Sequence, residues 1–309
     1  MAGKNIVLIY NPKAGGLHQT TAVVQRLLTA LEVNGIAVAN HQVLATTCAG
    51  DATRLAAQAV EQKADLVIVC GGDGTINETA QALVGTATAL AILPAGTANV
   101  LAKEMRLPRR AEDLARLIAA GSQREISVGL ASKPDKSWQR YFLLMAGIGL
   151  DATIIETVNP AQKKQWGLGS YVLAGLKTLV QWPVRPFTLQ YDQRQCEATF
   201  AIVANAANYA AWFKIAPRST MDSPQLDICI FNSQSRLMYL GYAFLSLFGA
   251  HTISPDVIYE PITAINAQNK EAATTIPVQL DGELVGHLPM QFSCVSQALR
   301  IVAPIATTR

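Results

Sequence analysis

The chain has 309 residues, of which 50% are hydrophobic and 15% are charged, and its formal net charge is +3 at pH 7. This length can supply two domains with hydrophobic cores of their own. Charged residues interrupt every apolar stretch before it reaches membrane-spanning length, and the small net charge gives no reason to expect a nucleic-acid partner. The N-terminus has no secretory signal pattern and the five cysteines lack metal-ligand spacing, so we expect a cytosolic protein with reduced thiols.

Three apolar strands in the first third of the chain each end in a small turn and continue into a helix. These strands and turns are residues 5–10 with NPKAGG (11–16), residues 65–70 with GGDGTINE (71–78), and residues 89–94 with PAGT (94–97). Helices are predicted over residues 18–35 and 76–84, and again after the third turn. Strands and helices alternate until about Gly121, which predicts an open parallel sheet that binds its ligand at the carboxyl ends of the strands.

The turns have the composition of an anion-binding site. Glycines let backbone N–H groups approach an anion closely, and a helix N-terminus adds a favourable dipole. Asp73 lies among the glycines, which indicates phosphate together with a divalent ion, or phosphate together with an acid/base group. An ordinary strand-turn-helix connection remains the alternative for any single turn. The pattern matches neither the G-x-G-x-x-G fingerprint nor the G-x-x-x-x-G-K-[ST] loop.

The pattern of the sequence changes after Gly121, where short β-rich segments with polar turns predominate. They predict an antiparallel β-sandwich that two helical stretches, at about 159–181 and 235–250, interrupt. The predicted strands are EISVGLA, RYFLLMAGIG, FTLQYD, EATFAIVAN, LDICIF, TAINAQ, IPVQLDGE, MQFSCV and ALRIVAP. We therefore predict an α/β nucleotide domain over residues 1–124, a β-sandwich domain over 125–296, and a C-terminal strand and tail over 297–309.

The ordered motifs resemble those of the diacylglycerol kinase catalytic-domain family, which includes bacterial lipid kinases and is more distantly similar to NAD kinases and 6-phosphofructokinases. The resemblance rests on NPKAGG, GGDGTINE, LPAGTANVLA (93–102), GIGLDA (147–152), KKQWGLGSYVLAGLKTL (163–179), ANAANYAAWFKIAP (204–217) and VQLDGELVG (278–286). It implies an active site in the cleft between the two domains, with the last strand packed back onto the first domain. It also implies an ATP- and Mg²⁺-dependent kinase that phosphorylates a lipid hydroxyl at the inner membrane face.

The resemblance assigns the nucleotide to the three turns. The residues that would contact adenosine and phosphate are Asn11, Lys13, Gly15, Gly16, Gly71, Gly72, Gly74, Thr75, Gly96, Thr97 and Asn99. Asp73 would hold the magnesium that bridges the nucleotide phosphates. Glu78 falls in the first turn of the predicted helix, where a role as partner of the helix dipole is at least as well supported as a nucleotide contact.

The second acidic motif is the run Asp281-Gly282-Glu283, which between two β-rich pieces is also a strong hairpin signal. The resemblance makes Glu283 the general base for the lipid hydroxyl. Asp73 is the rival for this role, and the sequence does not separate the two. Phosphoryl transfer mainly needs positioning, neutralised charge and a carboxylate near the attacking hydroxyl, so either acid suits the chemistry.

Residues 214–230 depart from the family pattern. Ser223 and Pro224 occupy the positions of an Asp-Gly pair that, in bacterial relatives, helps to hold a structural magnesium. A hydroxyl is a poor ligand for this ion, so we expect the site to be absent or weak, with Asp222 as a doubtful substitute. Ala206, Ala207, Ala210 and Ala211 replace a stretch that is usually richer in glycine, and this change would alter the lipid-side pocket.

Aromatic and basic residues alternate at helical spacing over residues 163–182. Such a helix usually packs on its own domain, but here it could also meet a membrane interface with anionic head groups. The acceptor stays open among diacylglycerol, a sphingoid base, ceramide, an isoprenoid alcohol or another lipid, and a homodimer also stays open. Two other functions remain: a soluble kinase of the NAD or sugar-phosphate type, and a catalytically weak nucleotide-binding regulator.

Overall fold

The computed structural model describes residues 5–15, 17–157, 175, 178–209, 213–271 and 273–304. The chain divides into two compact units. Unit 1 comprises Met1–Ser127 with Ser296–Arg309, and unit 2 comprises Val128–Val295. The chain passes between the units within two strands, β5 (Gln123–Ser132) and β16 (Met290–Val302).

Unit 1 contains a parallel sheet with the strand order β2-β1-β3-β4. The strands are β1 (Ile6–Tyr10), β2 (Val43–Ala45), β3 (Leu66–Gly71) and β4 (Ala89–Pro94). The register pairs Tyr10 with Cys70 and Gly71 with Pro94, so the carboxyl ends of β1, β3 and β4 are level at one edge. The end of β16 lies on the far side of β4, where Ile301 pairs in parallel with Leu90.

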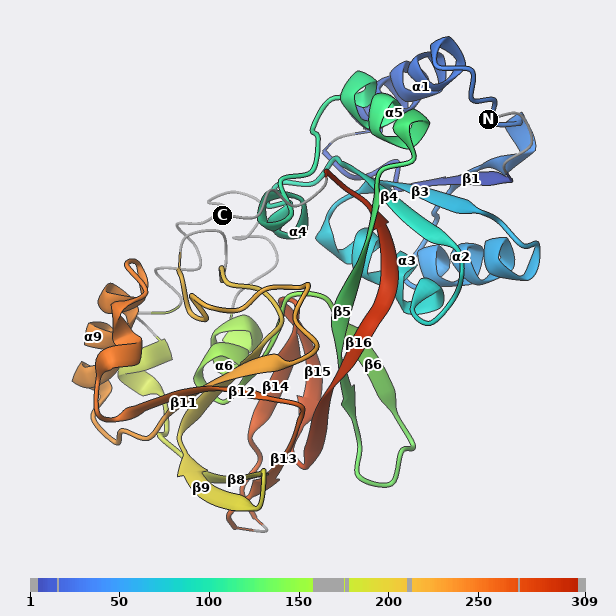
Figure 1. Ribbon diagram of the computed structural model, residues 1–309. Coiled ribbons are helices and arrows are strands. Elements are labelled where there is room, and N and C mark those ends of the chain that lie inside the picture. The colour runs from blue at the N-terminus through green and yellow to red at the C-terminus, as the bar shows by residue number, and fades with distance from the viewer. Residues whose placement is uncertain are drawn as a thin grey trace. The chain divides into compact units, whose positions relative to one another are not determined.

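Helices cover both faces of this sheet (Figure 1). α1 and α5 share one hydrophobic core with alternate sheet residues, and α2 packs against α3 on the other face. The helices of unit 1 are α1 (Leu17–Val33), η1 (Asn40–Gln42), α2 (Asp51–Glu61), α3 (Asp73–Leu83), α4 (Val100–Glu104) and α5 (Ala111–Ala120). The predicted open parallel sheet is thus confirmed, and α5 ends at Gly121, whose φ of 68° is readily adopted by glycine.

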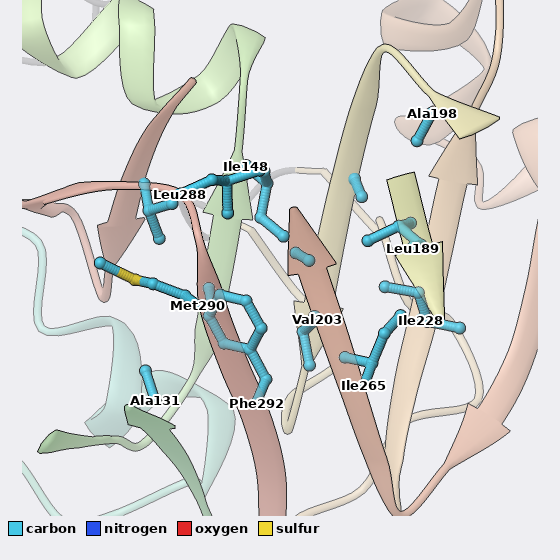
Figure 2. Packing of buried hydrophobic residues seen from close by; sticks show 14 of the residues in the cluster. Ala131, Ile148, Leu189, Ala198, Val203, Ile228, Ile265, Leu288, Met290 and Phe292 are labelled. Carbon is cyan, nitrogen blue, oxygen red and sulfur yellow. The ribbon is translucent and has the colours of Figure 1, made fainter. Parts of the chain in front are cut away.

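Unit 2 contains antiparallel sheets, as predicted. One has the order β12-β11-β10-β7-β14-β15; in the other, unit 2 contributes β13, β8, β9, β6 and parts of β16 and β5. The strands are β6 (Gln139–Phe142), β7 (Met145–Ile148), β8 (Phe187–Tyr191), β9 (Arg194–Ala198), β10 (Phe200–Ala204), β11 (Leu226–Phe231), β12 (Val257–Ile262), β13 (Ala264–Asn269), β14 (Pro277–Leu280) and β15 (Glu283–His287). Figure 2 shows the apolar side chains that pack together from these strands, among them Ile148, Val203, Ile228 and Phe292.

Several predicted boundaries in unit 2 were wrong for identifiable reasons. The predicted strand over residues 140–149 is interrupted after Phe142, where the carboxylate of Asp281 accepts backbone hydrogen bonds. The predicted strand over 197–205 is two strands, and the pieces predicted at 290–295 and 298–304 are the single strand β16. β12 was missed; it contains Pro261, a residue that argues against a strand on sequence grounds.

Helices interrupt the strands of unit 2 at α6 (Leu150–Thr157) and at α9 (Arg236–Ser246), which η2 (Ala250–Ile253) follows. The helix predicted at 235–250 is therefore confirmed. The one predicted at 159–181 falls mostly outside the described residues, and so does most of the aromatic and basic segment. None of the helices within the described ranges is long and apolar enough to cross a membrane.

Candidate functional site

The second and third turns of unit 1 meet through their glycines. A Cβ atom on Gly96 would lie 2.5 Å from the Cα of Gly72, and one on Gly72 would lie 3.3 Å from the Cα of Gly96. The backbone N–H of Ala95 also donates to the carbonyl of Gly71 at 2.9 Å. A side chain at position 96 would overlap with the backbone of Gly72, whereas one at position 72 would make a tight contact, so the approach of the two turns depends mainly on Gly96.

Asn11 ties the first turn to the second. Its Nδ2 donates to Oγ1 of Thr75 at 3.1 Å, and its backbone N–H donates to the carbonyl of Cys70 at 3.0 Å. Its Oδ1 accepts the backbone N–H of Lys13 at 2.9 Å, which shapes the NPKAGG turn. The structure therefore brings together Asn11 and Thr75, two residues that the sequence analysis assigned to the nucleotide, and gives each a part in holding the turns.

Asn99 closes the third turn from within. It has a φ of 49°, a conformation that asparagine tolerates better than most residues, and it is buried. Its Oδ1 accepts the backbone N–H of Gly96 at 2.9 Å, and its Nδ2 donates to the carbonyl of Gly96 at 2.7 Å. The side chain thus fixes the loop that precedes α4.

Asp73 is the first residue of α3 and is half-buried. Its Oδ1 accepts the backbone N–H of Val100 at 2.8 Å, at the start of α4. α3 begins three residues earlier than predicted because Gly72 is extended and its carbonyl accepts the N–H of Ile76 at 3.0 Å. The acid thus links the second turn to the third and sits beside the glycines at the sheet edge.

The remaining predicted nucleotide residues of unit 1 lie at the same strand ends. Lys13, Gly74 and Thr97 are exposed, and Gly15 has a φ of 64°. Gly16 lies outside the described residues. A nucleotide with its magnesium fits this set of groups, because Mg²⁺ in kinase sites usually takes one or two carboxylates together with phosphates and water. Asp73 would supply the carboxylate, and the exposed glycine-rich backbone and Lys13 would face the phosphates.

Glu78 has a structural contact, but not the one expected. It lies beyond the first turn of α3, and its Oε2 accepts the backbone N–H of Ala52 at 3.3 Å, in the first turn of α2. Its own carbonyl accepts the hydroxyl of Thr53 at 2.8 Å. The carboxylate therefore partners the N-terminus of the neighbouring helix rather than that of its own.

The acidic run in unit 2 forms the predicted hairpin turn between β14 and β15. Asp281 and Gly282 both have positive φ, 48° and 88°, as a two-residue hairpin turn often requires. The Asp281 carboxylate accepts three backbone N–H groups, from Leu143 at 2.7 Å, Leu144 at 2.9 Å and Met145 at 3.0 Å. Asp281 therefore anchors the turn to the chain just before and at the start of β7.

Glu283 has a different partner. Its side chain is 49% exposed, and its Oε2 lies 2.6 Å from Nη2 of Arg140 on β6, whose side chain is 25% exposed. Arg140 could not be predicted as a site residue, because 143 residues separate it from its acid and no local pattern links them. The ion pair limits the orientations available to the Glu283 carboxylate.

A buried acid, Asp151 in the GIGLDA motif, lies next to this turn and was not among the predicted site residues. Its Oδ1 accepts the hydroxyl of Tyr209, and its Oδ2 accepts Nε2 of Gln279 at 2.6 Å. The Oε1 of Gln279 in turn accepts the N–H of Gly282 at 2.7 Å. The side chain of Asp151 is buried, and burial raises its pKa to about 6, although both hydrogen bonds act in the opposite direction.

The loop at the doubtful structural-metal site is closed by its own hydrogen bonds. Ser223 accepts the backbone N–H of Gln225 on its hydroxyl at 3.1 Å and donates its own N–H to the carbonyl of Thr220 at 3.0 Å. Asp222 is exposed. Within the described ranges, no group of three or more His, Cys, Asp or Glu residues could hold a metal ion. The prediction of an absent or weak site therefore stays a prediction.

Unit 2 also has a cavity of about 190 Å³ beside α6. It is lined in part by Gly149, Thr153, Glu156, Arg185 and His287. Thr153 of α6 is therefore one of the residues that face this cavity. Because both an acidic residue, Glu156, and a basic one, Arg185, line the cavity, its charge does not indicate which lipid is the acceptor.

An open α/β unit with three interlocked glycine turns, combined with an antiparallel β unit that carries an exposed acid in a hairpin turn, defines a two-domain kinase. Comparison with known proteins gives the family. The diacylglycerol kinase catalytic domain matches residues 5–131, and the YegS C-terminal NAD kinase β-sandwich-like domain matches residues 145–303. The chain belongs to the diacylglycerol kinase catalytic-domain family and is a lipid kinase.

Individual relatives agree over nearly the whole chain. A diacylglycerol kinase of Bacillus subtilis (strain 168) is 29% identical over 308 residues, which cover 97% of each protein. One from Staphylococcus aureus (strain MRSA252) is 28% identical, over 97% of this chain and 93% of the relative. The crystal structure of a diacylglycerol kinase from Bacillus anthracis (strain Sterne) has the same fold, with a TM-score of 0.73 at 22% identity over 98% of each chain.

Proposed function

We propose that this lipid kinase transfers the γ-phosphate of Mg²⁺-bound ATP to the hydroxyl of diacylglycerol or a related lipid alcohol. The observation that carries the proposal is the interlocking of the three turns, in which Gly72, Gly96, Asn11 and Asn99 hold Asp73 beside exposed glycine-rich backbone. Such an edge suits a triphosphate and its metal ion. The names of the bacterial relatives support diacylglycerol as the first acceptor to test.

Glu283 is the proposed general base. Of the two acids in the turn, Asp281 is occupied by three backbone N–H groups, whereas Glu283 is exposed and held by a single arginine. A carboxylate that orients and deprotonates the lipid hydroxyl must reach a substrate outside the protein core, and of the two acids in the turn Glu283 is the more exposed. Arg140 would fix its orientation. The interdomain active site implied by the resemblance remains part of this proposal.

The test uses purified protein with labelled ATP, Mg²⁺ and a panel of lipids that includes diacylglycerol, a sphingoid base, ceramide and an isoprenoid alcohol. Glu283→Gln should lower turnover by about two orders of magnitude and leave ATP affinity nearly unchanged, as expected for loss of a general base. Glu197→Gln is the matched control, because Glu197 is also 49% exposed in unit 2 and also pairs with a cation, Lys270, at 2.6 Å.

The outcomes separate the proposal from its alternatives. Phosphorylation of NAD or a sugar phosphate, but of no lipid, would indicate a soluble kinase of that type. ATP binding without transfer to any acceptor would indicate a nucleotide-binding regulator. Near-normal turnover in Glu283→Gln, together with a large loss in Asp73→Asn, would move the base to Asp73.

Peripheral association with an anionic membrane is the second part of the proposal, and α9 supports it. Exposed large hydrophobic residues gather on α9 and the turn after it: Leu237, Met238, Leu240, Phe244, Leu247, Phe248 and Ile253. Arg236 is the only charged residue within α9. An apolar helix face without acidic residues is the composition expected of an interfacial segment. Co-sedimentation with phosphatidylglycerol vesicles should weaken in Phe244→Ser and not in Val33→Ser, an exposed apolar residue of unit 1.

A further inference from the structure

Three separate family motifs meet at one buried carboxyl group in unit 2. Asp151 comes from GIGLDA at the start of α6, Tyr209 from the segment after β10, and Gln279 from β14. The side chain of Asp151 is 5% exposed and that of Gln279 is fully buried. In the sequence these motifs are far apart, and each is a separate point of resemblance to the family. Their convergence on a single acid has no explanation in the roles already proposed.

The glycine before α6 makes room for this acid. A Cβ on Gly147 of β7 would overlap with Oδ2 of Asp151 and would lie 2.7 Å from Nε2 of Gln279. The Asp151 carboxyl therefore packs directly on the backbone of β7. β7 is the strand that pairs with β14, and Gly147 is the register partner of Gln279. The acid and the glutamine are held in place by the sheet that leads into the acidic turn.

The donors and acceptors in the series of hydrogen bonds from Asp151 through Gln279 to Gly282 can be assigned by starting at Gly282. The backbone N–H of Gly282 can only donate, so the side-chain atom of Gln279 that faces it must be the acceptor Oε1. The other end of the same amide must then be the donor Nε2, and the Asp151 oxygen that faces it must accept. A carboxylate accepts at both oxygens, so Asp151 locks the amide of Gln279 in the one orientation that binds Gly282. Gly282 immediately precedes Glu283.

We infer that Asp151 is a positioning residue for Glu283, acting through Gln279 on the turn that carries the proposed base. Tyr209 donates to the other carboxylate oxygen and restrains Asp151 from the side of the segment after β10. This inference rests on the proposed function, because it assigns to the buried acid the placement of that base. Asp281 anchors the same turn from the other side, through the backbone before β7. The two acids therefore hold the turn through separate partners.

Three substitutions are expected to have different effects. Asp151→Ala and Gln279→Leu both break the chain to Gly282, and each should lower kcat by about tenfold to a hundredfold while the KM for ATP stays within about twofold. Asp151→Asn can still present a carbonyl oxygen to Gln279, so it should keep most of the activity. The double variant Asp151→Ala with Gln279→Leu should have a kcat no lower than that of the worse single variant, because the two substitutions interrupt the same series of hydrogen bonds.

Hydrogen–deuterium exchange gives a readout that does not depend on activity. Peptides that span the turn, residues 278–286, should exchange faster in Asp151→Ala and in Gln279→Leu than in the wild type and Asp151→Asn. Peptides from β11 should be unchanged in all four proteins. Thr157→Ala serves as a control on α6, because the Thr157 hydroxyl donates to the carbonyl of Ile154 and takes no part in the chain to Gly282; it should match the wild type in both assays.

Three results would contradict the positioning role of Asp151 or the proposed function. Unchanged exchange over 278–286 in folded Gln279→Leu would overturn the inference whether or not a lipid substrate has been found. Normal kcat in folded Gln279→Leu, or losses that multiply in the double variant, would overturn it for catalysis. Failure of the wild type to phosphorylate any lipid would instead refute the proposed function, and the exchange measurement would still decide whether Asp151 orders the turn.

Discussion

Replacement of Asp151 by asparagine should change how the stability of unit 2 depends on pH. Asp151 is buried, and among the described residues the groups that shift its pKa besides burial are the two hydrogen-bond donors Tyr209 and Gln279. Burial raises its pKa from the usual 3.8 to about 6. Asparagine keeps the shape of the side chain and cannot titrate, so the difference between the two proteins isolates this one group.

The sign follows from proton binding. Between pH 3.8 and about 6, the folded protein holds a proton on Asp151 that the unfolded chain has already lost. Raising the pH through this range therefore favours unfolding. The stabilisation is fully present below pH 3.8 and is lost above about pH 6. A pKa of about 6 against 3.8 corresponds to about 3 kcal/mol in the free energy of unfolding.

Urea denaturation followed by tryptophan fluorescence measures this free energy for unit 2 alone. All four tryptophans, Trp138, Trp166, Trp182 and Trp212, fall within Val128–Val295. The free energy of unfolding of the wild type minus that of Asp151→Asn should fall by about 2.4 kcal/mol between pH 4 and pH 7.5, because part of the full difference lies below pH 4. Other titrating groups, including the buried His251, whose pKa burial lowers, act on both proteins and cancel in the difference. Parallel curves for the two proteins would refute the reasoning.

Three further predictions concern the turns. Gly96→Ala should lower ATP affinity by at least about tenfold in calorimetry, because the new Cβ would press on Gly72 and part the two turns; full affinity in this variant would show that their contact does not shape the site. Asp281→Ala should lower the free energy of unfolding of unit 2 by about 3 kcal/mol, because three backbone N–H groups lose their acceptor, whereas a loss below about 1 kcal/mol would mean that water replaces the carboxylate. Asp73→Asn should bind ATP with little dependence on Mg²⁺ in the same calorimetric titration, and a normal magnesium dependence would remove Asp73 from the metal site.

The strand-end turns could be predicted because their signal is local. An apolar run that stops at glycines indicates the end of a buried strand. It also indicates a place where the backbone comes close to a ligand or to another segment of backbone. The sequence could not show that part of this closeness is between the turns themselves, at Gly72 and Gly96. Nor could it show that Asn11 and Thr75 bond to each other, because 64 residues separate them. Such contacts depend on the register of neighbouring strands, which local patterns do not report.

The strand boundaries in unit 2 failed for a related reason. Residues 140–149 are continuously β-rich, and nothing in that segment predicts a break. The break is made by Asp281, which is more than 130 residues away and takes the N–H groups of Leu143, Leu144 and Met145. A distant carboxylate thus replaces strand pairing as the partner of this backbone. The strand propensity of a segment cannot show that its backbone will form hydrogen bonds with a residue from a distant part of the chain.

The two acids of the hairpin turn show how far sequence reasoning reaches for the candidate site. Asp281 and Glu283 are separated by a single glycine, both are carboxylates, and both could serve a phosphoryl transfer. Their surroundings separate them: the carboxylate of Asp281 is used by the backbone, whereas Glu283 is exposed beside Arg140. The turn is then held from two sides, by Asp281 and by the chain from Asp151 through Gln279. An acid that must move little while it accepts a proton needs such support, and the support comes from buried polar groups whose partners are set only by the fold.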